Sequence, residues 1–145
     1  MILFKPEMAQ AILEGRKTVT RRVGKKRWNV GAIRLCYTRP AFARPNPGKP
    51  FARIEVLSVT QEAFPGAAAP NWERAKTRED LRVVLAFEAA REGFGVQGWG
   101  EFARAFRHMH GAAALDEPCY RVEFRLVEVL APEVEAQVRE GMAHG

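Results

Sequence analysis

The sequence predicts an α+β fold in which helices flank a curled, mostly antiparallel sheet that forms a small β-barrel. Short β-prone stretches are separated by breakers rich in proline and glycine. Apolar residues recur with helical spacing near the N-terminus, in the middle of the chain and at the C-terminus. With 145 residues, 47% of them apolar, the chain suits one domain over residues 1–145, with its core at about 2–130.

Four strands are expected before residue 60, with one short helix between the first two. In each of them apolar or β-branched residues dominate or alternate with polar ones. The expected strands are residues 2–4, 18–23, 30–38 and 51–59. Pro6 suits the first turn of the helix, which we expect to end near Leu13 because Gly15 follows. The four prolines of residues 39–50 predict a long basic loop.

The second half predicts helices followed by a closing strand. Thr77 and Asp80 form a capping box, with Asp in place of the usual Glu or Gln, and the helix that they begin should stop at Gly93. A shorter turn is expected at Trp72, capped by Asn71. The remaining elements are a helix within residues 98–111, a strand over 119–130 and an amphipathic C-terminal helix over about 132–142.

Charge is distributed unevenly along the chain, whose net charge is +6. Residues 1–53 hold 13 Lys and Arg but only two acids, which gives +11, whereas residues 54–145 give −5. If the first third folds onto one side, it makes a positive face, for which nucleic acid is the usual partner. The alternative is an arginine-rich proteome, since the chain has 17 Arg and 6 Lys and few amides, a composition that loosely indicates a thermophilic source.

Several classes of protein are disfavoured by what the sequence lacks. No apolar run approaches the roughly 20 residues of a membrane span, and the N-terminus has no signal-like apolar stretch, so we expect a cytoplasmic protein without a membrane partner. Cys36 and Cys119 are isolated and should be buried thiols. His108 and His110 lie two apart, which matches no zinc pattern, so we expect no metal and no cofactor.

The segment GRKTVTRR, residues 15–22, concentrates cations around two threonines. In a strand Thr18, Thr20 and Arg22 share one side, and Val19 and Val23 share the other. Lys17 joins Thr20 only if the regular strand starts after it. A cavity with a hydroxyl, an amine and a guanidinium is one interpretation, and an edge strand with solvated cations, which spacing alone slightly favours, is the other.

Glu92 lies in the last turn of its predicted helix, where an acid opposes the helix dipole by about 0.3–1 kcal/mol. It therefore calls for a cationic partner, supplied either by the basic first third or by the adjacent Arg91. A carboxylate beside Lys17 and Thr20 would complete a group able to transfer acyl groups through an activated hydroxyl. Trp28 follows a basic run and is the best candidate for stacking on a base, although core packing is the ordinary role of a tryptophan.

An ordered set of motifs resembles the ASCH domain, a family with a PUA-like fold. Phe4 comes first, and AILEGRKTVTRR, Gly31 before a strand, REGF, the spaced aromatics Trp99, Phe102 and Phe106, and YRVEFRLV follow in that order. The likeness spans Phe4 to about Val127. One departure is Gly31-Ala32, where the family often has Gly-Asp, so a role for that Asp does not carry over.

The resemblance implies a β-barrel flanked by helices with a cleft near the GRKT segment. The family is generally regarded as RNA-binding, and some small bacterial members are amidohydrolases that remove acetyl from N4-acetylcytidine. Their catalytic set falls by motif on Lys17, Thr20 and Glu92 of this chain.

Three functions therefore stay open on the sequence. The first is a module that binds RNA or a modified nucleoside through the basic segment. Its expected ligand contacts are Arg16, Thr18, Arg21, Arg22, Lys25, Lys26, Arg27 and Trp28. The second is an amidohydrolase acting on acylated cytidine, in which Thr20 attacks and Lys17 accepts its proton. The third is a protein-interaction domain, whose mark would be an exposed apolar patch.

Overall fold

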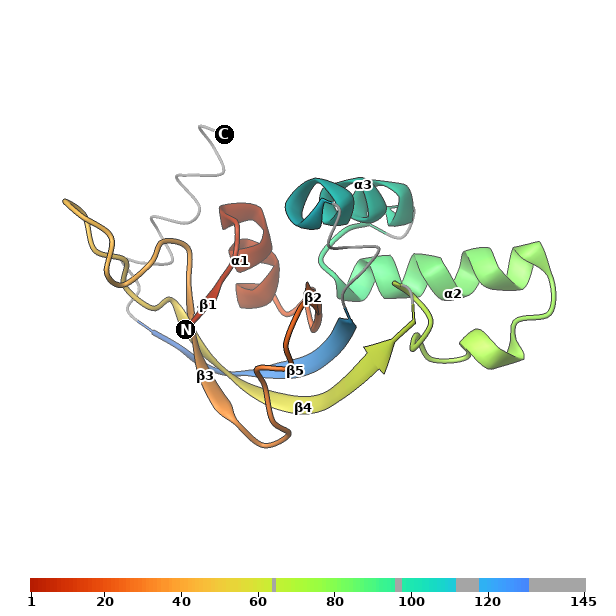
Figure 1. The fold of residues 1–145 in the computed structure, drawn as a ribbon, viewed down its shortest axis with the longest axis horizontal. Helices are drawn as coiled ribbons and strands as arrows, with labels where there is room; N and C mark the ends of the chain where they lie inside the picture. Colours follow the sequence, from red (N-terminus) through yellow and green to blue (C-terminus); the bar gives the residue numbers. More distant parts are fainter. Residues whose placement is uncertain (64, 96–97, 112–117, 131–145) are drawn as a thin grey trace.

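In the part of the chain that the structure describes, a curled sheet of five strands joins three α-helices, two of which lie over its concave side (Figure 1). The computed structural model describes residues 1–63, 65–95, 98–111 and 118–130. The strands are β1 (Ile2–Leu3), β2 (Val19–Val23), β3 (Ile33–Tyr37), β4 (Ala52–Glu62) and β5 (Cys119–Val129). The helices are α1 (Pro6–Leu13), the 3-10 turn η1 (Trp72–Arg74), α2 (Arg78–Arg91) and α3 (Trp99–His110).

The sheet has the strand order β1-β3-β4-β5-β2, so its first two strands in sequence form its two edges. Only the β1–β3 pair is parallel, and the other three pairs are antiparallel. Two register shifts in the long β4–β5 pair interrupt the ladder, and bulges of this kind increase the local bend of a strand. The α+β prediction is confirmed, and within the described residues the predicted barrel takes the form of an open half-barrel.

Local signals predict where α1 and α2 begin and where α1 ends, because a specific residue marks each of these positions. Helix α1 begins at Pro6 and ends at Leu13, and Gly15 follows it with a φ of +78°. Helix α2 begins with the predicted capping box, in which the Thr77 hydroxyl accepts from the Asp80 N–H. Asn71 precedes η1, as expected, but caps it without a side-chain hydrogen bond. The expected C-terminal helix over about 132–142 lies outside the described residues.

The main core lies between the concave face of the sheet and α1. It includes Phe4, Ile12, Phe51, Ile54 and Phe124, all almost fully buried. A second cluster under α3 contains Phe102, Phe106 and Cys119. Both cysteines are buried free thiols, as predicted. Across the described residues, the helices are too short or too polar to span a bilayer. The two clusters leave a gap between α1 and α3, and the candidate site lies there.

Candidate functional site

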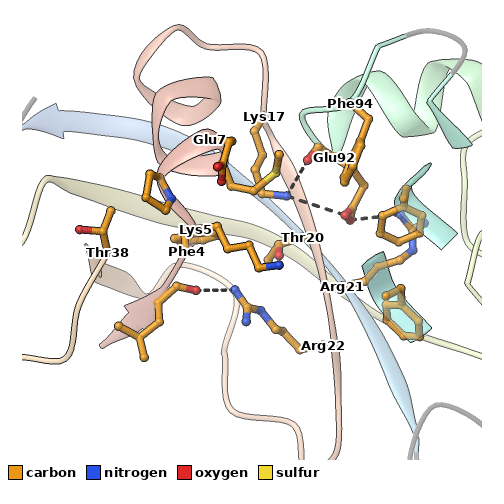
Figure 2. A pocket seen from close by; sticks show the side chains of 15 residues that line it. Phe4, Lys5, Glu7, Lys17, Thr20, Arg21, Arg22, Thr38, Glu92 and Phe94 are labelled. Atoms are coloured by element: carbon orange, nitrogen blue, oxygen red, sulfur yellow. Dashed lines mark hydrogen bonds and ion pairs between the residues drawn. The ribbon is translucent and has the colours of Figure 1, made fainter. Parts of the chain in front are cut away.

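A cavity of about 610 Å³ is bounded by α1, the two edge strands, the end of α2 and α3 (Figure 2). Most of the surface of its wall is apolar, although about half of the residues that line it have polar side chains. The apolar residues that line it are Leu3, Phe4, Pro6, Met8, Phe94, Phe102 and Phe106. The polar ones are Lys5, Glu7, Lys17, Thr20, Arg21, Arg22, Thr38 and Glu92. An apolar hollow with a few convergent polar groups is the usual character of a small-molecule site.

Lys17 enters the cavity because the chain turns sharply after α1. Gly15 adopts the positive φ that a residue with a Cβ rarely does, and the N–H groups of Arg16 and Lys17 both donate to the Ala11 carbonyl, at 2.8 and 3.0 Å. The regular strand β2 starts only at Val19, so Lys17 is free of the strand's alternation. Lys17 and Thr20 were expected to share a site only if the regular strand starts after Lys17, and it does.

The amine of Lys17 is buried, with 4% of the residue exposed, and is held by three contacts. Its Nζ donates to the carbonyl oxygens of Val19 and Glu92, both at 2.8 Å, and lies 3.7 Å from the Glu92 Oε2 (Figure 2). The pKa of Lys17 is lowered to about 8, chiefly because the amine is buried; Glu92 opposes this shift, and Arg22 and Arg21 add to it. A neutral amine would keep both carbonyl bonds, because it retains two N–H groups, and would have one lone pair left for another proton.

Glu92 caps the C-terminal end of α2 and is 3% exposed. Its Oε2 faces Lys17, and its Oε1 lies 3.4 Å from the Arg21 Nη1, so two cations share the carboxylate. Burial raises the pKa of Glu92, although Lys17 and Arg21 oppose this. The predicted cationic partner from the basic first third is confirmed. Arg91, the alternative, pairs with Glu88 at 3.2 Å instead.

Thr20 lies on β2 opposite Val122 of β5 and is 5% exposed. Its side chain lines the cavity beside Lys17 (Figure 2). Within the described part of the chain, no hydrogen bond occupies its hydroxyl. Lys17, Thr20 and Glu92 therefore converge on one cavity, from the α1–β2 turn, from β2 and from the end of α2.

Arg21 lies at the back of the site in a buried ion-pair network. Its Nε and Nη2 donate to the two oxygens of Glu62 at 2.7 and 2.9 Å, and Nη2 also donates to Glu88 at 2.8 Å. Glu88 in turn accepts from Arg121. The guanidinium of Arg21 also lies 5.8 Å from the Phe102 ring. Burying such a pair is costly, but breaking it leaves an uncompensated charge in the interior.

Two expected ligand contacts are wrong in light of this packing. Arg21, expected to bind RNA, is 3% exposed and held by carboxylates, because it shares the side of β2 that Val19 and Val23 occupy. Trp28, expected to stack on a base, is 6% exposed and belongs to the main core. Trp28 lies outside the cavity wall, and Arg21 lines the cavity but is already paired with carboxylates.

The other expected contacts fall into two groups. Arg22 lines the cavity and is treated below. The remaining residues lie outside the cavity wall and keep a role in RNA binding only as a prediction. Of these, Arg16, Lys25, Lys26 and Arg27 are exposed, and Thr18 is half-buried. Among the described residues, no cluster of three His, Cys, Asp or Glu has the geometry of a metal site.

The sequence analysis missed the carboxylates behind the site and the role of the aromatics. Glu88 is the one that a pattern could have revealed, since it lies one helical turn before Glu92 and therefore faces the same way. Glu62 and Arg121 meet Arg21 only through the strand order β4-β5-β2, which sequence spacing does not show. Phe102 and Phe106 were expected as spaced aromatics of the motif set, but not as part of a cavity wall.

Comparison with known proteins identifies the fold. No family model matches the sequence, and no curated protein matches it closely. The crystal structure of EF3133 from Enterococcus faecalis V583, assigned to the family model DUF984, has a TM-score of 0.51 to this chain. The likeness covers 89% of this chain and 80% of EF3133, with 18% identity. An ASCH domain from Lactobacillus crispatus JV V101 aligns over 82% of this chain and 69% of its own, with a TM-score of 0.47 and 22% identity.

Identities this low are evidence of fold and not of function. The half-barrel with its flanking helices agrees with the fold that the sequence motifs implied. This chain therefore shares the fold of the EF3133 structure, and that fold agrees with the PUA-like half-barrel that the sequence predicted.

Proposed function

We propose that the cavity between α1 and α3 binds a nucleoside, with the base against the aromatic side chains and its polar edge towards Lys17, Thr20 and Glu92. The observation that carries this proposal is the convergence of these three residues on a cavity of about 610 Å³ that aromatic side chains also line. Rings of Phe and similar residues stack on any base, and a few fixed donors and acceptors select its edge. The resemblance to the ASCH domain supports a ligand of this class.

Binding of cytidine and N4-acetylcytidine, followed by calorimetry, tests this proposal. Phe94→Ala should weaken binding about tenfold, because base–aromatic stacking contributes about 1–3 kcal/mol per base. Phe42→Ala is the matched control, since Phe42 is 73% exposed and lies outside the cavity wall. An unmodified, folded protein that binds neither compound, or an equal loss in both variants, would contradict the proposal.

A second candidate function, hydrolysis of an acylated amine on the nucleoside, is favoured by the lowered pKa of Lys17. The Oγ1 of Thr20 would bond to the acyl carbon while its proton passes to the Nζ of Lys17. The bond from that carbon to nitrogen would then break as the leaving amine takes the proton from Lys17. Water would hydrolyse the remaining acyl-threonine ester. Glu92 would orient the amine of Lys17, and Arg22 would stabilise the oxyanion.

This candidate makes two measurable predictions. Thr20→Val should abolish release of acetate from N4-acetylcytidine while leaving the unfolding transition cooperative, because valine has the shape of threonine without its hydroxyl. Turnover by the unmodified protein should rise with pH through about 8, since Lys17 must be neutral to accept a proton. An unmodified protein without turnover would reject hydrolysis and leave nucleoside binding as the function.

RNA binding by the exposed cations is an extension of the same proposal. Arg16 lies within the GRKT segment, and Lys25, Lys26 and Arg27 follow β2. Such residues would contact phosphates outside the cavity and hold a strand whose base enters it. Affinity for single-stranded RNA should then fall steeply between low and moderate salt. An affinity that does not change with salt would remove this part of the proposal.

A further inference from the structure

One cation of the cavity wall has no carboxylate partner among the described residues. Among the described residues, three buried acids face three buried cations, and each of these cations has a carboxylate within 4.0 Å. The acids are Glu62, Glu88 and Glu92, and the cations are Lys17, Arg21 and Arg121. Arg22 is a fourth cation, next to Arg21 in the strand, and is not part of this balance.

Arg22 is held by the backbone rather than by an acid. Its Nη2 donates 2.9 Å to the carbonyl oxygen of Leu3, so it reaches from one edge strand, β2, to the other, β1 (Figure 2). Its Nε is buried and has no hydrogen-bond partner among the described residues. The guanidinium carbon lies 5.3 Å from the centre of the Phe4 ring. No described carboxylate lies within 4.0 Å of it.

A guanidinium in this setting is preorganised for an anion. Burial lowers the pKa of Arg22, which reflects the cost of holding a cation away from water, and Glu92 offsets only part of that cost. Planar donors arranged in a fork favour phosphate or carboxylate, which they bind with two hydrogen bonds. The contact with Phe4 and the bond to Leu3 fix the plane of the fork before any ligand arrives.

Lys5 adds a second cation on the same side of the cavity. It is exposed, it lines the cavity, and in Figure 2 its side chain extends towards Thr20 on the side where Arg22 lies. Glu7, the acid at the rim, lies towards Lys17 in this view. An anion between Lys5 and Arg22 would therefore meet two cations and would lie away from Glu7.

We propose that Arg22 and Lys5 bind the phosphate group of a nucleotide whose base occupies the aromatic part of the cavity, so that the ligand is a nucleotide and not a free nucleoside. This inference rests on the proposed nucleoside site and names the class of its ligand. The cavity already has base-sized room beside Phe94 and Phe102, and the phosphate supplies the negative charge that the wall lacks. The phosphate can belong to a free nucleotide or to an RNA chain.

Calorimetry with cytidine, its 3′- and 5′-monophosphates and a short single-stranded RNA tests the inference. We expect one monophosphate to bind about 10- to 100-fold more tightly than cytidine, the range of a hydrogen bond to a charged group. Arg22→Gln should abolish this preference, and Lys5→Gln should reduce it. Arg53→Gln, which removes an exposed arginine outside the cavity wall, should leave it unchanged. An RNA that binds more tightly than either monophosphate would identify the chain as the source of the phosphate.

The outcomes separate this inference from the nucleoside site itself. Equal affinity for cytidine and both monophosphates in the unmodified protein would overturn the phosphate site while leaving the nucleoside site intact. If cytidine does not bind, the nucleoside site fails, and titration with inorganic phosphate followed by the ³¹P NMR shift still tests the anion site. Should Arg22→Gln not fold, the ratio in the unmodified protein and the effect of Lys5→Gln decide the matter. If the Lys5→Gln variant prefers the monophosphate over cytidine as strongly as the unmodified protein does, Lys5 does not bind the phosphate.

Discussion

Arg21 and Arg22 are neighbours on the same strand, yet their side chains have opposite surroundings. Both line the cavity, but Arg21 contacts three carboxylates, whereas Arg22 bonds to a backbone carbonyl and has no carboxylate partner among the described residues. The alternation of a strand separates them, since consecutive side chains point to opposite faces. One strand thus supplies a cation that stabilises the fold and, one residue later, a cation available to a ligand. The predictions below test this division.

The largest expected effect is the loss of the network behind the site. Arg21→Met should destabilise the protein by about 3–5 kcal/mol, because it leaves Glu62 and Glu88 buried without their shared partner. Arg22→Met should cost only about 1 kcal/mol, since one hydrogen bond to Leu3 is lost. Urea unfolding of both variants measures the difference. Equal destabilisation would mean that Arg21 and Arg22 contribute equally to the free energy of unfolding.

The next effect is a pH dependence of stability that comes from Lys17. Its pKa of about 8 lies below the ordinary 10.5, so the unfolded chain binds more protons than the folded one between these values, and stability rises with pH. Relative to Lys17→Met, the unmodified protein should gain roughly 3 kcal/mol between pH 7 and 10.5. The comparison between the two proteins removes the contribution of other groups. Parallel curves would show that Lys17 titrates normally.

A smaller effect is expected at the turn that joins Glu92 to the cavity wall. Gly93 has a φ of +95°, and a Cβ there would lie 3.2–3.3 Å from Ala11, Met8 and Lys17. Gly93→Ala should therefore cost about 1–2 kcal/mol and shift the pKa of Lys17. Gly95→Ala is the control, because a Cβ at Gly95 meets nothing within 4 Å. Urea unfolding compares the two variants, and similar losses would rule out a special role for the turn.

The smallest effect belongs to an exposed ion pair on the sheet. Arg53 lies 2.6 Å from Glu128, but both side chains are about half exposed, at 45% and 50%. Arg53→Gln should cost about 0.2–1 kcal/mol, because water and salt screen such pairs. Urea unfolding at low and high salt checks this value. A loss as large as that of Arg21→Met would show that burial does not distinguish the two arginines.

The elements of the fold were predictable where a local signal marks them. The sequence marks the start of α1 at Pro6, its end before Gly15 and the start of α2 at the Thr77–Asp80 box. The structure has these helix ends at the same places. The strand order and the curl of the sheet were not predictable in the same way, since they depend on β1 pairing in parallel with β3 and on the bulges of the β4–β5 pair. Local patterns describe single elements, whereas strand order depends on contacts far apart in the chain.

The site was predictable in part for the same reason. The motif resemblance named Lys17, Thr20 and Glu92 together, and they do share one cavity. A cation count could not tell a paired arginine from an unpaired one, because the partners of Arg21 come from β4 and α2. The sequence predicted that the first third would supply a cation to Glu92, but it did not show that Arg21 from the same segment pairs with Glu62 and Glu88.

If a nucleoside occupies the cavity beside Thr20, titration of the protein with N4-acetylcytidine will change the methyl NMR spectrum. The Thr20 methyl resonance should shift on addition of N4-acetylcytidine, together with the ring protons of Phe94 and Phe102, which line the same cavity. The exposed Phe42 should give no shift. If the resonances of Thr20 and both rings stay unchanged, or if only Phe42 shifts, the nucleoside does not bind in this cavity.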